Sequence, residues 1–491
     1  MRPSSDHARR QRGATVADRR ALAQGGARAI GGVVGIGIAA VVIAGATLLP
    51  LSGFAIDSPS QTVRPVPADQ QRVCPGPVLA LAADAGQATR PSAVGDFSAV
   101  YGASGTDTQS RTLKPDAETT SSDQAPLALT ATTPQGAGHA PLFAGSQVET
   151  VTTDDLAGLA AAACAEPSAD SWLVAGATTL GQTSLVMLAN PTSVDATVNL
   201  DIYTETGRVS APGATGILVP AGSQKVVPLA GLAPSATAPV VHVTTTGGQV
   251  VATMQQSFEQ GIQPRGVELA GATGAPARVQ TIPGVTVASL AAITAGQSAE
   301  SVGVDYPTVR ILVPGDQDAK ITIGAVGETG TNAGNSYAQT VKAGNVAEIP
   351  LDNLKDGAFT VTVRSDVPVV AAVSTSVIGT NSRDFSWFAS TAPLGHTQLV
   401  AVPSGPGPQL HFANAGEADA KVTVRLSSQD STTVTVPAEG GANLAVRSGR
   451  YTLTGVDGLE VSVSVAGDGL ASSFTVAPAG PLATPIEVYP H

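Results

Sequence analysis

The stretch LVMLANPTSVDATVNLDIY (residues 185–203) decides the fold class, because its second half alternates apolar and polar side chains. Val198, Leu200 and Ile202 share one face of an extended chain, and Asn199 lies on the other. A period of two is typical of an antiparallel strand with one face in the core and one toward water. We therefore expect a half-buried strand here.

The same pattern recurs twice further along the chain. DATVNLDIY starts at Asp195, DAKITIGAV at Asp318 and DAKVTVRLS at Asp419, so the starts are 123 and 101 residues apart. An apolar strand and a turn precede each copy, and a second matched turn follows it, as VPAGS, VKAGN or VPAEGG. Short alternating strands closed by Gly, Pro and Asn turns are typical of β-sandwiches of the immunoglobulin type.

We therefore predict a mostly β fold, with an N-terminal transmembrane helix, a small disulfide-closed domain and three tandem β-sandwich units of the immunoglobulin-like kind. Three similar segments, SWLVAGATT, VELAGATG and SWFASTAP, each stand shortly before a unit begins and place the boundaries. The predicted parts are a basic head (1–28), a transmembrane helix or signal anchor (29–56), an N-terminal exported domain (57–170), and units at 171–275, 276–390 and 391–491.

Charge is divided sharply along the chain. The first 28 residues hold seven arginines and two aspartates, a net charge of +5, and the total of −12 therefore leaves −17 for the rest. Aromatic residues make up only 3% and charged residues 13% of the sequence. The acidic part lacks the clustered Lys and Arg that phosphate contacts require, so we expect no binding of nucleic acid.

Residues 30–51, IGGVVGIGIAAVVIAGATLLPL, carry only apolar or small side chains. As a helix they would be about 33 Å long, enough to cross a bilayer. The arginine excess on the N-terminal side predicts a cytoplasmic head and residues 57–491 outside the membrane. A cleaved signal, with secretion of the rest, is the alternative, since Gly53 and Ala55 form a pair of small residues that a signal peptidase could use.

The chain has two cysteines, Cys74 and Cys164, and both follow the apolar segment. Outside the cytoplasm a lone pair of cysteines is most simply a disulfide. A nucleophilic cysteine would need a positioned base, and the six histidines are scattered singly in the sequence. We predict a bridge that joins the start of the 57–170 domain to its end.

Within that domain, the tract TLKPDAETTSSDQAPLALTATTPQGAG (residues 112–138) is polar and predicts a long loop or a partly disordered segment. TTDDLAGLAAAACAEP follows at residues 152–167 and predicts one short helix. Thr153 would be its cap, two aspartates would stand in its first turn, and Pro167 would follow its end.

No motif for catalysis or for phosphate binding is present, and we predict no catalytic residue, cofactor or metal site. The spaced acids of GDQDAK (residues 315–320) and DNLKDG (352–357) are too few for a calcium loop and indicate solvated turns. The aromatic cluster of Phe385, Trp387 and Phe388 could stack on a sugar, but Trp172 stands at the same place in another unit. Packing at a domain junction is therefore the favoured interpretation.

The segments RVCPGP, AAACAEPSADSWLVAGA, LVMLANP and SDVPVVAAV, together with the apolar N-terminal segment, carry a resemblance across the exported part. In this order they resemble an uncharacterised actinobacterial family of membrane-anchored or secreted β-rich envelope proteins, a domain of unknown function. The resemblance implies an exported β-rich protein and no assigned activity, so it supplies no functional residues.

These observations predict a non-enzymatic extracytoplasmic envelope protein: a rod of β-sandwich units that serves as a scaffold, a spacer or a partner of cell-wall assembly machinery. Its expected partners are the membrane, through residues 30–51, and an envelope protein or a cell-wall polysaccharide. The alternative is a carbohydrate-binding or carbohydrate-processing cell-wall protein. A glycosidase needs two facing carboxylates in a cleft, and the sequence identifies no such pair.

Overall fold

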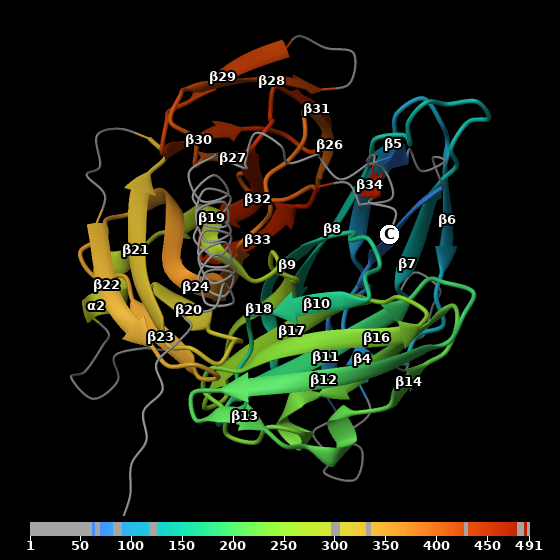
Figure 1. Ribbon diagram of the computed structural model, residues 1–491. Helices are drawn as coiled ribbons and strands as arrows, with labels where there is room; N and C mark the ends of the chain where they lie inside the picture. Colours follow the sequence, from blue (N-terminus) through green and yellow to red (C-terminus); the bar gives the residue numbers. More distant parts are fainter. Residues whose placement is uncertain are drawn as a thin grey trace, which may run out of the picture. The chain divides into compact units, whose positions relative to one another are not determined.

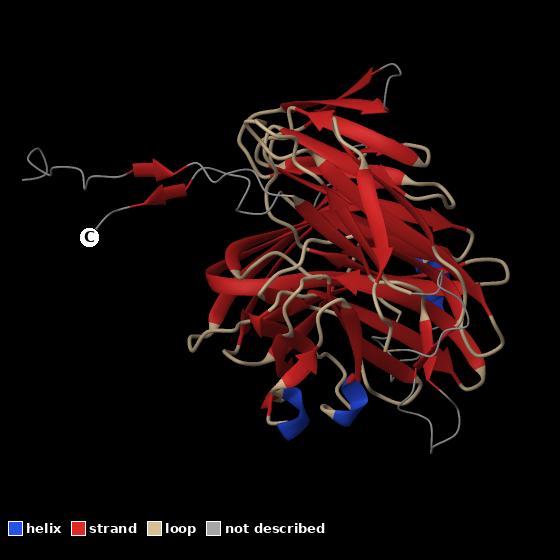
Figure 2. Cartoon of the chain, turned by 90° about the vertical axis from the view of Figure 1, so that its right-hand side faces the viewer, coloured by secondary structure: helices blue, strands red, loops and turns tan. Residues whose placement is uncertain are grey.

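Alternating sequence forms strands in nearly every described part of the chain, as Figure 2 shows. The helices of this part are short: α2 (Leu290–Ala295) and the 3-10 turns η3 (Pro212–Ala214) and η4 (Leu229–Gly231). The computed structural model describes residues 61–63, 69–81, 91–116, 125–295, 305–329, 335–426, 431–478 and 486–488.

The predicted transmembrane segment at residues 30–51 lies outside the described residues. Within the described ranges, no helix has the length and hydropathy needed to cross a membrane. Two short strands, β1 (Gln61–Val63) and β34 (Ile486–Val488), pair antiparallel and belong to a separate compact unit. The other strands lie in the unit formed by residues 65–484.

The opening stretch lies in module 1 (residues 170–271), which consists of two antiparallel sheets. One sheet has the order β10-β16-β12-β13, with β14 also paired to β12, and the other has the order β15-β11-β17-β18. The strands are β10 (Asp170–Leu173), β11 (Gln182–Asn190), β12 (Ala196–Thr204), β13 (Gly207–Val209), β14 (Ile217–Val219), β15 (Ser223–Pro228), β16 (Val240–Gly247), β17 (Val251–Gln260) and β18 (Gln263–Gly271).

Module 2 (residues 277–389) repeats this strand order around one long strand, β24. The first half of β24 pairs with β19 and β21, and its second half pairs with β20 and β25. The strands are β19 (Ala277–Val287), β20 (Thr308–Leu312), β21 (Ala319–Gly327), β22 (Asn335–Val341), β23 (Val346–Pro350), β24 (Gly357–Ile378) and β25 (Arg383–Ala389).

Module 3 (residues 397–476) has the order β26-β31-β28-β29 in one sheet and β30-β27-β32-β33 in the other (Figure 1). In all three modules, the last strand along the chain lies at the edge of the second sheet. The strands are β26 (Thr397–Val402), β27 (Gln409–Asn414), β28 (Ala420–Leu426), β29 (Ser431–Val436), β30 (Gly440–Ala445), β31 (Gly449–Thr454), β32 (Leu459–Gly467) and β33 (Leu470–Val476).

The N-terminal module (residues 70–163) has three small sheets, with the orders β2-β7-β6, β3-β4 and β5-β8-β9. Its last strand, β9, is again an edge strand. The strands are β2 (Gln70–Cys74), β3 (Leu79–Leu81), β4 (Pro91–Ala93), β5 (Ser98–Ala103), β6 (Thr108–Thr112), β7 (Leu127–Ala131), β8 (Phe143–Thr152) and β9 (Ala157–Ala163).

The strands predicted after the repeated Asp-Ala pairs are confirmed in all three modules. Val198, Leu200 and Ile202 are buried on β12, and Thr197 is exposed. The matching positions of β21 are buried as well, as are Val422 and Val424 of β28, whereas Leu426 is half-buried. Register follows from this alternation, because a slip of one residue would expose the whole apolar set.

The repeated aspartate holds the second matched turn in each module. The carboxylate precedes the strand and accepts a backbone N–H from the turn, as side chains of Asp commonly do in local motifs. The N–H of Ala221 donates to Asp195 (2.8 Å), that of Ala343 to Asp318 (3.0 Å) and that of Ala438 to Asp419 (3.0 Å).

Two predictions for the N-terminal module are wrong. The alanine-rich segment predicted as a helix is strand β9, which pairs with β8 and is buried along most of its length. Thr153 is a turn residue instead of a helix cap, since its hydroxyl bonds with the N–H and carbonyl of Leu156. The polar tract at residues 112–138 contains β7, which pairs with β2 and β6. Packing between sheets here outweighs the helix propensity of alanine.

The predicted disulfide between Cys74 and Cys164 is confirmed. It joins the end of β2 to the residue that follows β9, and it closes a loop with a sequence separation of 90. The neighbouring residues Val73 and Ala165 also exchange two backbone hydrogen bonds. The start and end of the N-terminal module are therefore tied together covalently and by hydrogen bonds.

Candidate functional site

Four edge strands, one from each module, meet in the interior of the unit formed by residues 65–484. β9 contacts β18, β18 contacts β25, β25 contacts β33, and β33 contacts β9. We call these four strands the strand ring. The prediction of a rod is wrong for this unit, because in a rod the N-terminal module would not contact module 3.

Each ring strand packs one face against a neighbouring module. On β25, Phe385 and Trp387 lie in the core of module 1, whereas Phe388 lies in the core of its own module 2. On β9, Leu159 and Ala161 lie in the core of module 3. The strands β25 and β9 thus contribute side chains to the core of a neighbouring module, and the four strand contacts close a ring.

The carboxylate of Asp384 lies where the four strands meet. Its Oδ2 accepts the backbone N–H groups of Leu159 on β9 (2.8 Å) and Ala471 on β33 (3.2 Å). Its Oδ1 accepts those of Val267 on β18 (3.2 Å) and of Phe385 on its own strand (3.0 Å). Edge strands leave backbone donors unpaired, and here one side chain satisfies a donor from every ring strand.

Two glycines leave room for this carboxylate. A Cβ added at Gly266 would stand 2.5 Å from Asp384 Oδ1, and one at Gly158 would stand 2.8 Å from the same atom. Gly158 and Gly266 each precede a residue whose N–H bonds Asp384. Gly158, Gly266 and Asp384 thus occupy equivalent positions of three ring strands, because each directly precedes a residue whose N–H binds the carboxylate.

Glu268 on β18 is a second buried acid beside the ring. Its Oε1 accepts hydrogen bonds from the hydroxyl of Ser472 on β33 (2.6 Å) and from the backbone N–H of Leu269 (2.9 Å). Burial raises the pKa of Glu268 to about 8, although these hydrogen bonds oppose the change. Burial also raises the pKa of Asp384 well above its usual value, and the charge of Glu268 adds to that effect.

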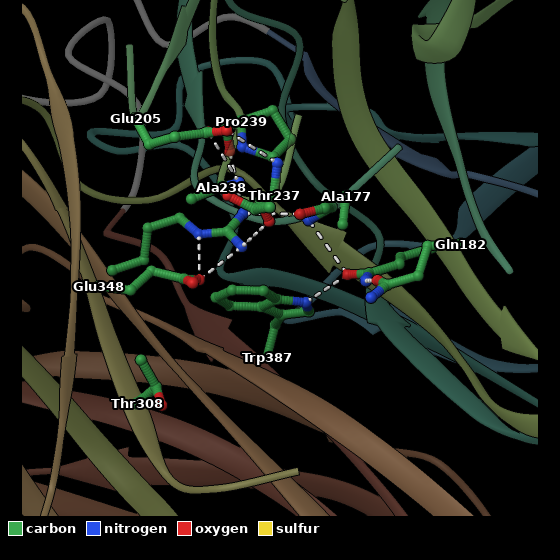
Figure 3. Close-up of polar contacts among 12 residues, drawn as sticks. Ala177, Gln182, Glu205, Thr237, Ala238, Pro239, Thr308, Glu348 and Trp387 are labelled. Carbon is green, nitrogen blue, oxygen red and sulfur yellow. Dashed lines mark hydrogen bonds and ion pairs between the residues drawn. The ribbon is translucent and has the colours of Figure 1, made fainter. Parts of the chain in front are cut away.

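Arg310 on β20 lies at the junction between modules 1 and 2, because it binds both module 1 and Glu348 of module 2. Its partners Thr237, Pro239 and Glu348 are labelled in Figure 3. Its guanidinium is buried, and it stacks 4.5 Å from the centroid of the Trp387 ring. Burial lowers the pKa of Arg310, and the attraction of Glu348 opposes this. The acceptors of its N–H groups are Gly176 O (2.7 Å), Pro239 O (3.0 Å), Thr237 O (3.2 Å) and Glu348 Oε1 (2.8 Å from Nη2 and 3.1 Å from Nε).

This junction borders a cavity of about 360 Å³, whose walls include Arg310, Trp387 and Gln256. Gln256 Oε1 accepts the indole N–H of Trp387 at 2.7 Å, and Gln256 donates to Gln182 (Figure 3). Five hydrogen bonds occupy the guanidinium, so it holds two modules together and has no donor left for a ligand. The interpretation of the aromatic cluster as packing at a junction is confirmed.

A third buried network joins modules 2 and 3. His411 Nδ1 lies 2.6 Å from Glu328 Oε2, and His411 Nε2 lies 2.8 Å from the Ser464 hydroxyl. Glu328 also accepts the backbone N–H of Gly284 at 2.9 Å. The order serine, histidine, carboxylate is that of a hydrolase triad. However, Ser464 is buried and lines none of the cavities described here, so the network is a structural contact.

The spaced acids of the two predicted turns bind backbone. Asp318 accepts an N–H from its matched turn, and Asp356 accepts those of Ser289 and Leu290 at the start of α2. In the part of the chain that the structure describes, no three His, Cys, Asp or Glu side chains are grouped so as to hold a metal ion.

A cavity of about 290 Å³ lies at the carboxyl ends of the ring strands. Residues at or just after the ends of β9, β18, β25 and β33 line it, among them Cys164, and so does the buried Arg72 of β2. Sequence reasoning missed this cavity, because its lining comes from four modules that lie far apart in the chain.

Comparison with known proteins places these features in context. A family model described as a family of unknown function (DUF5719) matches residues 116–447. No curated protein matches the sequence.

Two solved structures are similar to parts of the chain. One is the crystal structure of Thermotoga maritima 1070, at 21% identity and a TM-score of 0.20, covering 23% of this chain and 93% of that one. The other is the Anabaena sensory rhodopsin transducer, at 20% identity and a TM-score of 0.17, covering 20% of this chain and 97% of that one.

Proposed function

Because this chain belongs to the family of unknown function DUF5719, we propose its function from its own geometry: it is a non-enzymatic extracytoplasmic envelope protein. It acts as a scaffold or spacer for a protein partner, and its four modules serve as one body. In this proposal residues 30–51 hold the body to the cell membrane, with the basic head in the cytoplasm.

The observation that carries the proposal is the closure of the strand ring around Asp384. Three buried polar groups hold modules together: Asp384 bonds four strands, Arg310 joins modules 1 and 2, and Glu328 joins modules 2 and 3. A protein whose buried polar groups hold its modules in fixed positions is suited to present surfaces at fixed distances from one another. The Cys74–Cys164 bridge supports an oxidising compartment.

One exposed surface suits a protein contact. Leu180 and Ile262 are almost fully exposed, at 102% and 93%. They lie on neighbouring turns of module 1, since Glu259 donates its N–H to the carbonyl of Gly181. Exposed large apolar side chains that occur together are typical of interaction sites.

No observation favours the carbohydrate alternative. Phe385, Trp387 and Phe388 are buried, so their rings are not free to stack on a sugar. Asp384 and Glu268 are close in space but lie in the interior, whereas glycosidase carboxylates flank a substrate cleft.

The proposal is tested by photo-crosslinking in living cells. A photoreactive amino acid is placed at Leu180 and, in a second strain, at Ile262, with exposed Ser210 as the matched control position on the same module. We expect both test positions, and not the control, to capture one and the same envelope protein. Equal capture at all three positions, or none at any, would contradict a specific partner at this surface.

The localisation has its own test. Protease added to intact protoplasts should digest residues beyond about 57 and spare the basic head, as the positive-inside rule predicts. Protection of the large part would overturn the extracytoplasmic placement.

A further inference from the structure

Arg72 differs from the other buried arginine, Arg310, in how its guanidinium is satisfied. Arg310 makes five hydrogen bonds to backbone carbonyls and Glu348. Arg72 is 7% exposed, yet among the described residues it makes one hydrogen bond, from Nη2 to Glu166 at 3.2 Å. Its Nε is buried without a partner among the described residues.

A buried guanidinium with unused donors is costly, because charged groups lose their hydration in the interior. Burial lowers the pKa of Arg72, and the charge of Glu166 offsets part of the effect. The ring of Phe143, 5.6 Å away, adds only a weak attraction. The guanidinium is therefore paired with one carboxylate, that of Glu166, and its buried Nε has no partner among the described residues.

Arg72 lines the cavity of about 290 Å³ at the end of the strand ring. The exposed surface of this cavity is mostly apolar, with walls that include Phe143, Trp172, Leu399 and Phe474. Small-molecule sites are commonly apolar cavities of roughly 300 Å³ or more with a few polar groups that fix orientation. Arg72 is the one cationic side chain among the described residues of this lining, which also includes the carboxylates of Glu166 and Asp170.

We infer that this cavity binds a small organic carboxylate, with its apolar body against the aromatic and aliphatic walls and its carboxylate on Arg72. Arginine suits this role because its fork of N–H donors matches both oxygens of a carboxylate. The position of Arg72 is fixed by the disulfide two residues further along β2. The inference goes beyond the proposed scaffold function and does not depend on it.

The test is calorimetric titration of the full-length protein in a neutral detergent with acetate, benzoate and 4-phenylbutyrate. The neutral amide of 4-phenylbutyrate controls for partition into micelles. We expect one saturable site for at least one of the aromatic acids, with at least tenfold weaker binding of the amide. Equal binding of acid and amide, or no saturable binding of any of the three acids, would overturn the inference.

Variants separate the site from general effects on folding. Arg72→Met should weaken acid binding at least tenfold, and the control Arg208→Met should leave it unchanged, since Arg208 is an exposed arginine of module 1. Glu166→Gln should tighten acid binding several-fold, because it removes the carboxylate that competes for Arg72. Unchanged affinity in both Arg72→Met and Glu166→Gln would also contradict the assignment, and the gain in Glu166→Gln cannot come from unfolding.

Discussion

At the level of residues, the surroundings of Asp384 are tightly packed. Three ring strands other than its own donate backbone N–H groups to this side chain. Gly266 approaches the carboxylate so closely that a methyl group has no room, and its φ of 140° is one that other residues rarely adopt.

Replacement of Gly266 by alanine should therefore destabilise the protein by on the order of 2 kcal/mol or more, from overpacking and backbone strain together. The measurement is the free energy of unfolding in denaturant. Gly271→Ala is the matched control on the same strand, because a Cβ there meets no atom within 4 Å. Equal losses in the two variants would contradict the crowding around Asp384.

At the level of elements, the repeated turn contact makes a second prediction. Asp318→Ala removes the acceptor for the N–H of Ala343 and should cost about 0.5 to 1.5 kcal/mol, the usual net value of one hydrogen bond. Asp316→Ala changes an exposed aspartate in the same turn and should cost little. Thermal unfolding of the two variants compares them directly, and a larger loss in Asp316→Ala would argue against this role of the repeat.

Sequence periodicity predicts those strands whose burial pattern and flanking turns are encoded in the local sequence. β12, β21 and β28 follow from alternation and from the turns beside them, and the disulfide follows from the count of cysteines. β9 could not be predicted in this way, because a run of alanines favours a helix in isolation. β9 is a strand because it packs against another module: Leu159 and Ala161 lie in the core of module 3.

At the level of the whole molecule, the ring and its end cavity were beyond prediction from the sequence. Leu159, whose N–H binds Asp384, lies 225 positions from it in the chain. No local pattern records that Gly158 and Gly266 face the same carboxylate. The aromatic cluster on β25 did give a signal, and it correctly indicated a junction between modules.

Buried acids also give the whole molecule a predicted pH dependence. The pKa of Glu268 is about 8 in the folded state against 4.5 ordinarily, so the folded state binds the proton more tightly. The contribution of Glu268 to stability is therefore present below about pH 4.5 and is lost as the pH rises through 8, by on the order of a few kcal/mol. Glu149 and Glu460, whose pKa values burial raises to about 7, act in the same direction.

Denaturant unfolding between pH 5 and pH 8.5 measures this dependence. The variant Glu268→Gln, which carries no charge at any pH, should show a weaker loss of stability as the pH rises. An unchanged slope in Glu268→Gln would mean that another group is responsible.

The closure of the strand ring is tested most directly by a cysteine pair between the N-terminal module and module 3. The hydroxyl oxygens of exposed Ser98 and Ser404 lie 3.3 Å apart, although the residues are 306 positions apart in the sequence. Side chains this close can form a disulfide. The double variant Ser98→Cys/Ser404→Cys should therefore form an intramolecular bridge, seen as a linked peptide by mass spectrometry. The control Ser98→Cys/Ser210→Cys should not. Free thiols at both positions of the test pair in folded, oxidised protein would contradict the ring.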